Sequence, residues 1–153
     1  MKKLKVYLDN CCFNRPYDEQ TNISIRLETE AKLYIQSEIK ANNLLLYWSY
    51  MLSYENSRNS DLFKRNTIEL WKDISFFIIQ PDKSIDIEAT KLNKLGFKGA
   101  DSLHIACSII GECDYFLTTD KGILNKRKLI DDINIINPLE FIENIYGGNY
   151  DDR

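Results

Sequence analysis

Hydrophobic and polar positions follow two different periods along this chain, and the change of period divides it into strands and helices. Short β-rich or apolar runs alternate with longer segments in which apolar residues recur at helical spacing among charges. The pattern predicts strands at residues 5–8, 44–48, 74–79, 115–117 and 133–136, and helices at residues 22–42, 51–57, 61–73, 84–95, 99–110 and 138–146.

Turn signals separate these segments. Gly96 and Gly111 each follow a predicted helix, and Pro138 can occupy the first position of the last one. A polar loop is predicted after the first strand, and a turn at residues 122–125. Because strands and helices alternate, we expect an α/β fold, a three-layer sandwich with a mostly parallel central sheet flanked by helices.

Length and composition indicate one packed domain. The 153 residues, 44% of them hydrophobic and 28% charged, show no repeat and no linker, so we expect a single domain over residues 1–148 and a frayed tail over residues 149–153. The apolar runs are far shorter than the roughly 20 residues that cross a bilayer. The first residues contain neither a long apolar segment nor a cleavage site, and we expect a cytoplasmic protein without a membrane span.

Charge and cysteines narrow the chemistry further. A net charge of -3 argues against charge-driven coating of nucleic acid, so any contact with nucleic acid must be local. A domain of this size does not need disulfides, and we expect its four cysteines to be free. Zinc is disfavoured, because His104, Cys107 and Cys113 have no clear fourth ligand.

Four acids stand at positions that favour a shared site. Asp9 and Asp120 directly follow predicted strands, Glu55 lies in the second helical segment, and Asp101 lies in the first turn of an apolar helix. Ligands of parallel α/β folds bind at the carboxyl ends of the strands. Carboxylates that converge there retain a proton or bind a hard cation, which favours Mg²⁺ or Mn²⁺ and metal-assisted phosphodiester hydrolysis. Alone, Asp101 could instead be a charge favoured by the helix dipole.

The sequence blocks around these acids resemble the PIN-domain family, a fold of metal-dependent nucleases and of the toxins in bacterial toxin–antitoxin pairs. The blocks are VYLDN at residues 6–10, SYEN at residues 53–56, GADSLHIA at residues 99–106 and DYFLTTD at residues 114–120. The resemblance implies an endoribonuclease that cleaves RNA, with catalytic Mg²⁺ or Mn²⁺ ligands at Asp9, Glu55, Asp101 and Asp120.

The same resemblance implies supporting residues and partners. Thr118 matches a frequent threonine of the family and is expected to hydrogen-bond within the site, with Asn10 as a second supporting residue. An antitoxin protein and a homodimer are also implied. After Asp9 the chain departs from the family's toxin members, because it continues with NCCFNRP instead of a small hydroxyl residue and an aliphatic stretch.

Basic residues near the acids are candidates for binding the substrate. We expect Arg15 and Lys121 to contact phosphates. Residues 126–128, with the sequence KRK, fit a phosphate contact and a solvated loop equally well. His104 could act as a general base, although a packed helix histidine is favoured.

Two alternatives to an active nuclease stay open. The stronger one is a PIN-like scaffold without turnover that binds a partner protein through the helix at residues 22–43. The weaker one is a response-regulator receiver, in which the early acidic pair would be reduced to Asp9 and Asn10.

Overall fold

The computed structural model describes residues 2–14 and 22–147. Its centre is a five-stranded sheet with the strand order β3-β2-β1-β4-β5, in which every neighbouring pair is parallel. This arrangement confirms the predicted α/β class. The strands are β1 (Leu4–Leu8), β2 (Leu44–Ser49), β3 (Phe77–Ile79), β4 (Tyr115–Leu117) and β5 (Asn134–Ile136).

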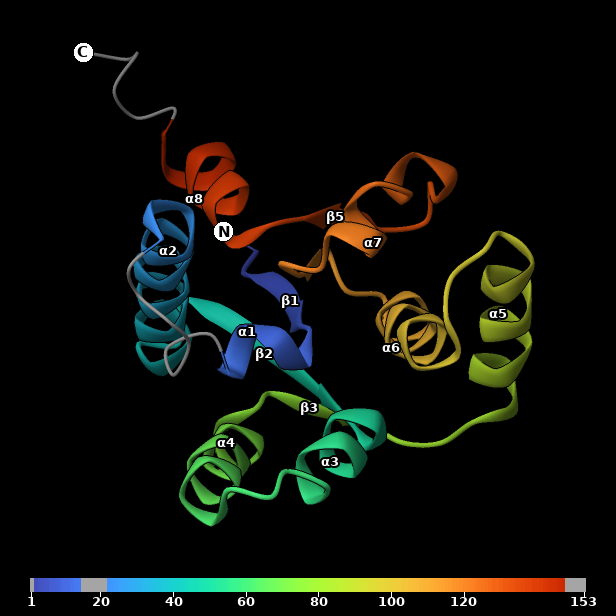
Figure 1. Cartoon of the computed structure of the whole chain (residues 1–153), viewed down its shortest axis with the longest axis horizontal. Coiled ribbons are helices and arrows are strands. Elements are labelled where there is room, and N and C mark those ends of the chain that lie inside the picture. Colours follow the sequence, from blue (N-terminus) through green and yellow to red (C-terminus); the bar gives the residue numbers. More distant parts are fainter. Residues whose placement is uncertain (1, 15–21, 148–153) are drawn as a thin grey trace.

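Helices cover both faces of this sheet. Figure 1 shows α2 and α8 together on one side and α5 and α6 together on the other. The helices of the described part are α1 (Asn10–Asn14), α2 (Ile23–Lys40), α3 (Tyr50–Ser57), α4 (Leu62–Ile74), α5 (Lys83–Lys94), α6 (Gly99–Ile110), α7 (Lys121–Leu124) and α8 (Pro138–Tyr146), with a 3-10 turn η2 (Arg127–Leu129). None of them is long and apolar enough to cross a membrane.

The core is built around the central strand β1 and the apolar helix α6. Val6, Tyr7 and Leu8 are buried between β2 and β4, while α6 buries Ile105 and Cys107. All four cysteines are free, as expected for a domain whose core suffices without disulfides.

Three local predictions are wrong. Residues 10–14 form helix α1 where a polar loop was expected, and this helix buries Cys12 and Phe13 in the core. The predicted turn at residues 122–125 is mostly helix α7, which the Asp120 side chain caps. Strand β3 starts at residue 77 and not at 74, because α4 continues to Ile74.

The register of the sheet positions the ends of β1 and β4. Leu8 lies opposite Leu117, and the Asp9 amide donates to the Leu117 carbonyl at 2.9 Å. The residues that follow the two strands therefore leave the sheet side by side at its carboxyl edge. Here β2 and β3 lie on one side of β1 and β4 and β5 on the other, so the strand order reverses at β1.

Candidate functional site

Asp9 is held by residues from both strand ends. Its Oδ2 accepts a hydrogen bond from Thr118 Oγ1 at 2.8 Å, and its Oδ1 accepts one from the Asn10 amide at 2.8 Å. The residue is only 7% exposed. A carboxylate this buried needs such donors, and they fix its orientation at the edge of the sheet.

Thr118 also connects Asp9 to Asp120. Its Oγ1 accepts from the Asp120 amide at 3.1 Å while its hydroxyl donates to Asp9. Asp120 Oδ1 accepts from the amides of Gly122 and Ile123, at 2.7 Å and 3.3 Å, and thereby caps α7. One threonine thus orders both acids that follow strands.

Asp101 lies in the first turn of α6 and shares a small cavity with Asp120. The cavity has a volume of about 50 Å³, and Lys98 and Lys126 also line it. Burial raises the pKa of Asp101, and the charges of Asp120 and Asp9 raise it further, against the lowering effect of His104 and Lys98. The charges of Asp9 and Asp120 therefore disfavour the ionised form of Asp101.

Glu55 contacts His104, which lies on α6 three residues after Asp101. Glu55 Oε1 lies 2.7 Å from His104 Nε2, while His104 Nδ1 lies 2.6 Å from the Tyr7 hydroxyl. The Tyr7 hydroxyl is also 2.6 Å from Ser49 Oγ, which accepts from the Leu52 amide at 3.2 Å. A hydrogen-bond chain thus runs from the fully buried Tyr7 to Glu55, whose side chain is 29% exposed.

The direction of this chain follows from the charge on His104. Burial lowers the pKa of His104, but the hydrogen bond with Glu55 and the charges of Asp9, Glu55 and Asp101 outweigh that effect and raise it. When His104 is protonated, both ring nitrogens donate, one to Glu55 and one to Tyr7, and Tyr7 donates to Ser49. Both N–H groups of His104 and the Tyr7 hydroxyl then have acceptors, which makes it possible for His104 to be only 1% exposed.

The donor set suits a hard divalent cation in its chemistry. The four acids supply only carboxylate oxygens, and Asn10 Oδ1 is a buried oxygen without a hydrogen-bond partner, adjacent in sequence to Asp9. Within residues 2–14 and 22–147, however, no three or more acids, histidines or cysteines are already gathered closely enough to hold an ion. The residues therefore suit Mg²⁺ or Mn²⁺ in the type of their donor atoms, but not in their spacing in this structure.

The basic residues that were expected to bind phosphate do not gather at one place. Lys121 lines a second, larger cavity beside the acids, while Lys126 lines the acid cavity and its Nζ donates to the Gly96 carbonyl at 2.5 Å. Arg127 pairs with Glu140 at 2.9 Å, and Lys128 is exposed. The KRK cluster is thus divided among different roles. Arg15 lies outside the described residues.

Cys11 also contacts the site, although no motif in the sequence pointed to it. Its sulfur lies 3.5 Å from Asp9 Oδ2, and it accepts from the amide and hydroxyl of Thr119, at 3.4 Å and 3.2 Å. A side-chain hydrogen bond with Cys12 lowers the pKa of Cys11. The only signal in the sequence was the position of Cys11 two residues after Asp9. Because residues 10–14 form a helix, the Cys11 side chain lies near the end of β1.

Comparison with solved structures identifies the fold but not the family. A crystal structure of FitAcB from Neisseria gonorrhoeae matches with a TM-score of 0.58 and 16% identity, over 87% of this chain and 97% of the other. VapBC2 from Rickettsia felis, bound to a DNA fragment from its promoter, matches with a TM-score of 0.55 and 14% identity, over 88% and 98%. No protein-family model and no curated protein matches the chain.

Proposed function

We propose that this chain is an Mg²⁺- or Mn²⁺-dependent endoribonuclease of the PIN type, with Asp9, Glu55, Asp101 and Asp120 as the metal ligands. The observation that carries the proposal is the placement of three of these acids at the carboxyl edge of the sheet: Thr118 bonds to both Asp9 and the Asp120 amide, and Asp101 lines one cavity with Asp120. Ligands of parallel α/β sheets bind at this edge. The shared fold of the solved structures is consistent with it.

A divalent ion held there would neutralise the carboxylates and activate water for attack on a phosphodiester. The residues around it have separate tasks. Thr118 keeps Asp9 and Asp120 in place by donating to one and accepting from the other. Lys98 and Lys126 line the same cavity and offer cations to the phosphate of a bound RNA strand.

Cleavage of labelled RNA by the purified full-length chain tests the proposal. We expect cleavage with Mg²⁺ or Mn²⁺ and none with a chelator. Asp101→Asn should reduce the rate by about 10–100-fold or more, because a lost ligand charge costs at least as much as a lost partner behind a ligand. Asp73→Asn, at an exposed acid near the end of α4, should cleave like the wild type. Equal cleavage with the chelator, or by Asp101→Asn, would contradict the mechanism.

A second candidate is a PIN-like binding module without turnover. It is favoured by the lack, within the described ranges, of a group of three ligands that is already assembled. Calorimetric titration with Mn²⁺ separates the two candidates. Binding that is lost in Asp9→Asn supports the nuclease, and no binding heat in either protein supports the module.

We further infer a protein partner of the antitoxin kind and a homodimer, with RNA cleavage in the cytoplasm. This inference depends on the sequence resemblance and on the fold shared with VapBC2. Analytical ultracentrifugation of the purified chain, with and without the product of the neighbouring gene, measures both assemblies. A monomer that binds no such product would contradict both.

A further inference from the structure

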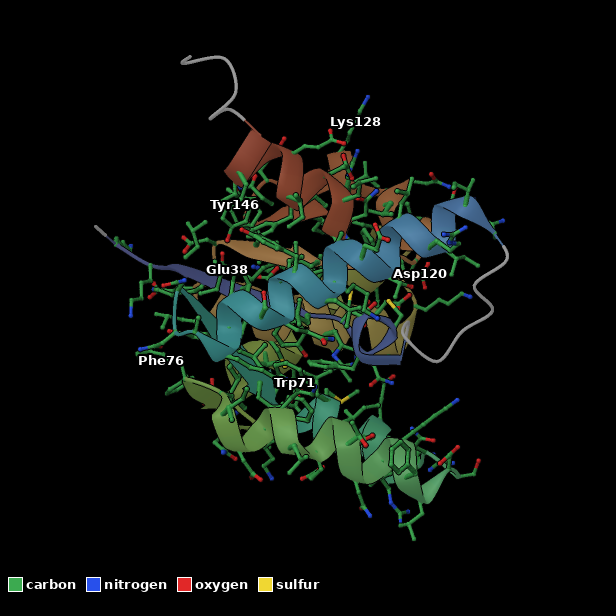
Figure 2. The ribbon with its side chains drawn as sticks, turned by 90° about the vertical axis from the view of Figure 1, so that its left-hand side faces the viewer. Glu38, Trp71, Phe76, Asp120, Lys128 and Tyr146 are labelled. Carbon is green, nitrogen blue, oxygen red and sulfur yellow. The ribbon has the colours of Figure 1, made fainter. Side chains whose placement is uncertain are left out.

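A cavity separate from the acid cavity lies on the other side of Asp120. It has a volume of about 510 Å³, and Thr119 and Lys121, the two chain neighbours of Asp120, form one wall. We call it the Lys121 cavity. The first two turns of α2 and the start of α8 complete it, with Asn22, Ser24, Ile25, Leu27, Glu28, Asn137 and Leu139. In Figure 2, where α2 faces the viewer, the label of Asp120 lies next to the N-terminal half of α2.

We propose that the Lys121 cavity binds the nucleoside next to the phosphate that is cleaved, so that it is a substrate subsite for RNA. The proposal rests on the proposed nuclease function. Its basis is the position of the cavity: because Thr119 and Lys121 flank Asp120, a strand whose phosphate lies at the acids must place a neighbouring nucleoside near them.

The size and the lining of the cavity suit a single nucleoside. Ligand cavities typically enclose about 300–1,000 Å³ and combine apolar walls with a few polar groups. Ile25, Leu27 and Leu139 supply apolar surface for the face of a base, while Asn22 and Asn137 supply amide groups for its edge.

The charged residues that line the Lys121 cavity determine how a nucleotide would be oriented in it. Lys121 is exposed and forms no ion pair within the described residues, so its ammonium is available for a phosphate. Glu28 lies on the α2 wall and repels a phosphate, which therefore belongs on the side of Thr119 and Lys121. A protein with a net charge of -3 needs such a local cation to hold an anion beside carboxylates.

Titration of the full chain with the four nucleoside 5′-monophosphates, in chelator and followed by NMR, tests the cavity without catalysis. We expect saturable binding that Lys121→Gln weakens by about 5-fold or more, since it removes the phosphate contact. Leu27→Trp should abolish binding, because the larger ring fills the cavity from a position that is already 44% exposed. Lys83→Gln and Leu62→Trp change exposed residues elsewhere and serve as matched controls.

Steady-state kinetics on RNA distinguishes this proposal from the nuclease itself. Lys121→Gln should raise KM and leave kcat unchanged, and the slope of log affinity against log salt should fall by about 0.7. If the wild type cleaves RNA but Lys121→Gln and Leu27→Trp behave like their controls, the subsite is wrong and the nuclease stands. If the wild type binds the monophosphates in the cavity but cleaves no RNA, the nuclease is wrong and the cavity remains a nucleotide site. The absence of saturable binding overturns the subsite.

Discussion

Replacing Tyr7 by phenylalanine removes one oxygen atom from the middle of the buried chain that connects Ser49, Tyr7, His104 and Glu55. The ring of Tyr7 stacks on Phe116 at a centroid distance of 5.4 Å, and phenylalanine keeps that contact. Burial raises the pKa of Tyr7 well above its ordinary value, so its hydroxyl is neutral at any pH of interest. The substitution therefore tests hydrogen bonding alone.

The magnitude follows from the two contacts of the hydroxyl, each 2.6 Å long. A typical hydrogen bond contributes about 1 kcal/mol net, and a buried group left without its partner costs about 1–3 kcal/mol. Ser49 keeps the Leu52 amide as a donor, whereas His104 Nδ1 loses its acceptor. We expect Tyr7→Phe to lower the free energy of unfolding by about 2–3 kcal/mol, a large part of the roughly 5–15 kcal/mol of a typical domain.

Urea unfolding followed by circular dichroism measures this loss. With a slope of about 2 kcal/mol per molar urea, the midpoint should fall by about 1 M. Tyr115→Phe is the matched control, because the Tyr115 hydroxyl makes no hydrogen bond in the described part of the chain and its ring keeps its contact with Phe141. Its change should stay within about 0.5 kcal/mol. Equal midpoints for the two variants would refute the stabilising role of the chain.

The remaining predictions concern helix ends and one ion pair. Gly111→Ala should lower the free energy of unfolding by about 1–3 kcal/mol, because a Cβ there would lie 2.8 Å from Ile79 Cδ1, whereas Gly99→Ala, with no atom within 4 Å, should be neutral or stabilising in the same urea assay. Arg127 lowers the pKa of Glu140, so the carboxylate stabilises the fold above its unfolded-state pKa of about 4.3, and this stabilisation is lost as the pH falls through the lower folded-state pKa. Glu140→Gln should therefore unfold more easily at pH 7 and converge with the wild type in acid, and parallel curves at all pH values would contradict this account.

Elements with local signals were predictable from the sequence. Helix α8 begins at Pro138 because Asn137 caps it and Glu140 completes a capping box, and both signals are contained in four residues. Gly96 has a φ of 101°, a conformation that favours glycine after a helix. Such features depend on neighbours along the chain, which a single sequence displays.

Features set by tertiary packing were not predictable in this way. Helix α1 exists because Cys12 and Phe13 pack into the core, and a segment of five residues is too short for a helical period to show that. The acids could be singled out from strand ends and motifs, but the pairing of Glu55 with His104 depends on how α3 and α6 face each other across 49 residues of sequence. The sequence pattern therefore indicates which residues belong to the site, but not which of them contact one another.

Asp101 differs from an acid that stabilises the fold through an ion pair. This chain does pair an acid for structure, since Glu140 is bonded to Arg127, and the pKa of Glu140 is lowered as a result. Asp101 has no ion pair in the described ranges, and its pKa is raised. Its negative charge therefore lowers the stability of the fold at neutral pH, and protonation in acid removes this cost. Asp101→Asn should therefore stabilise the metal-free chain in thermal melts while removing the stabilisation that Mn²⁺ adds to the wild type. A loss of stability in the variant without metal would mean that Asp101 serves the fold, and the case for a cation at this edge would lose its main support.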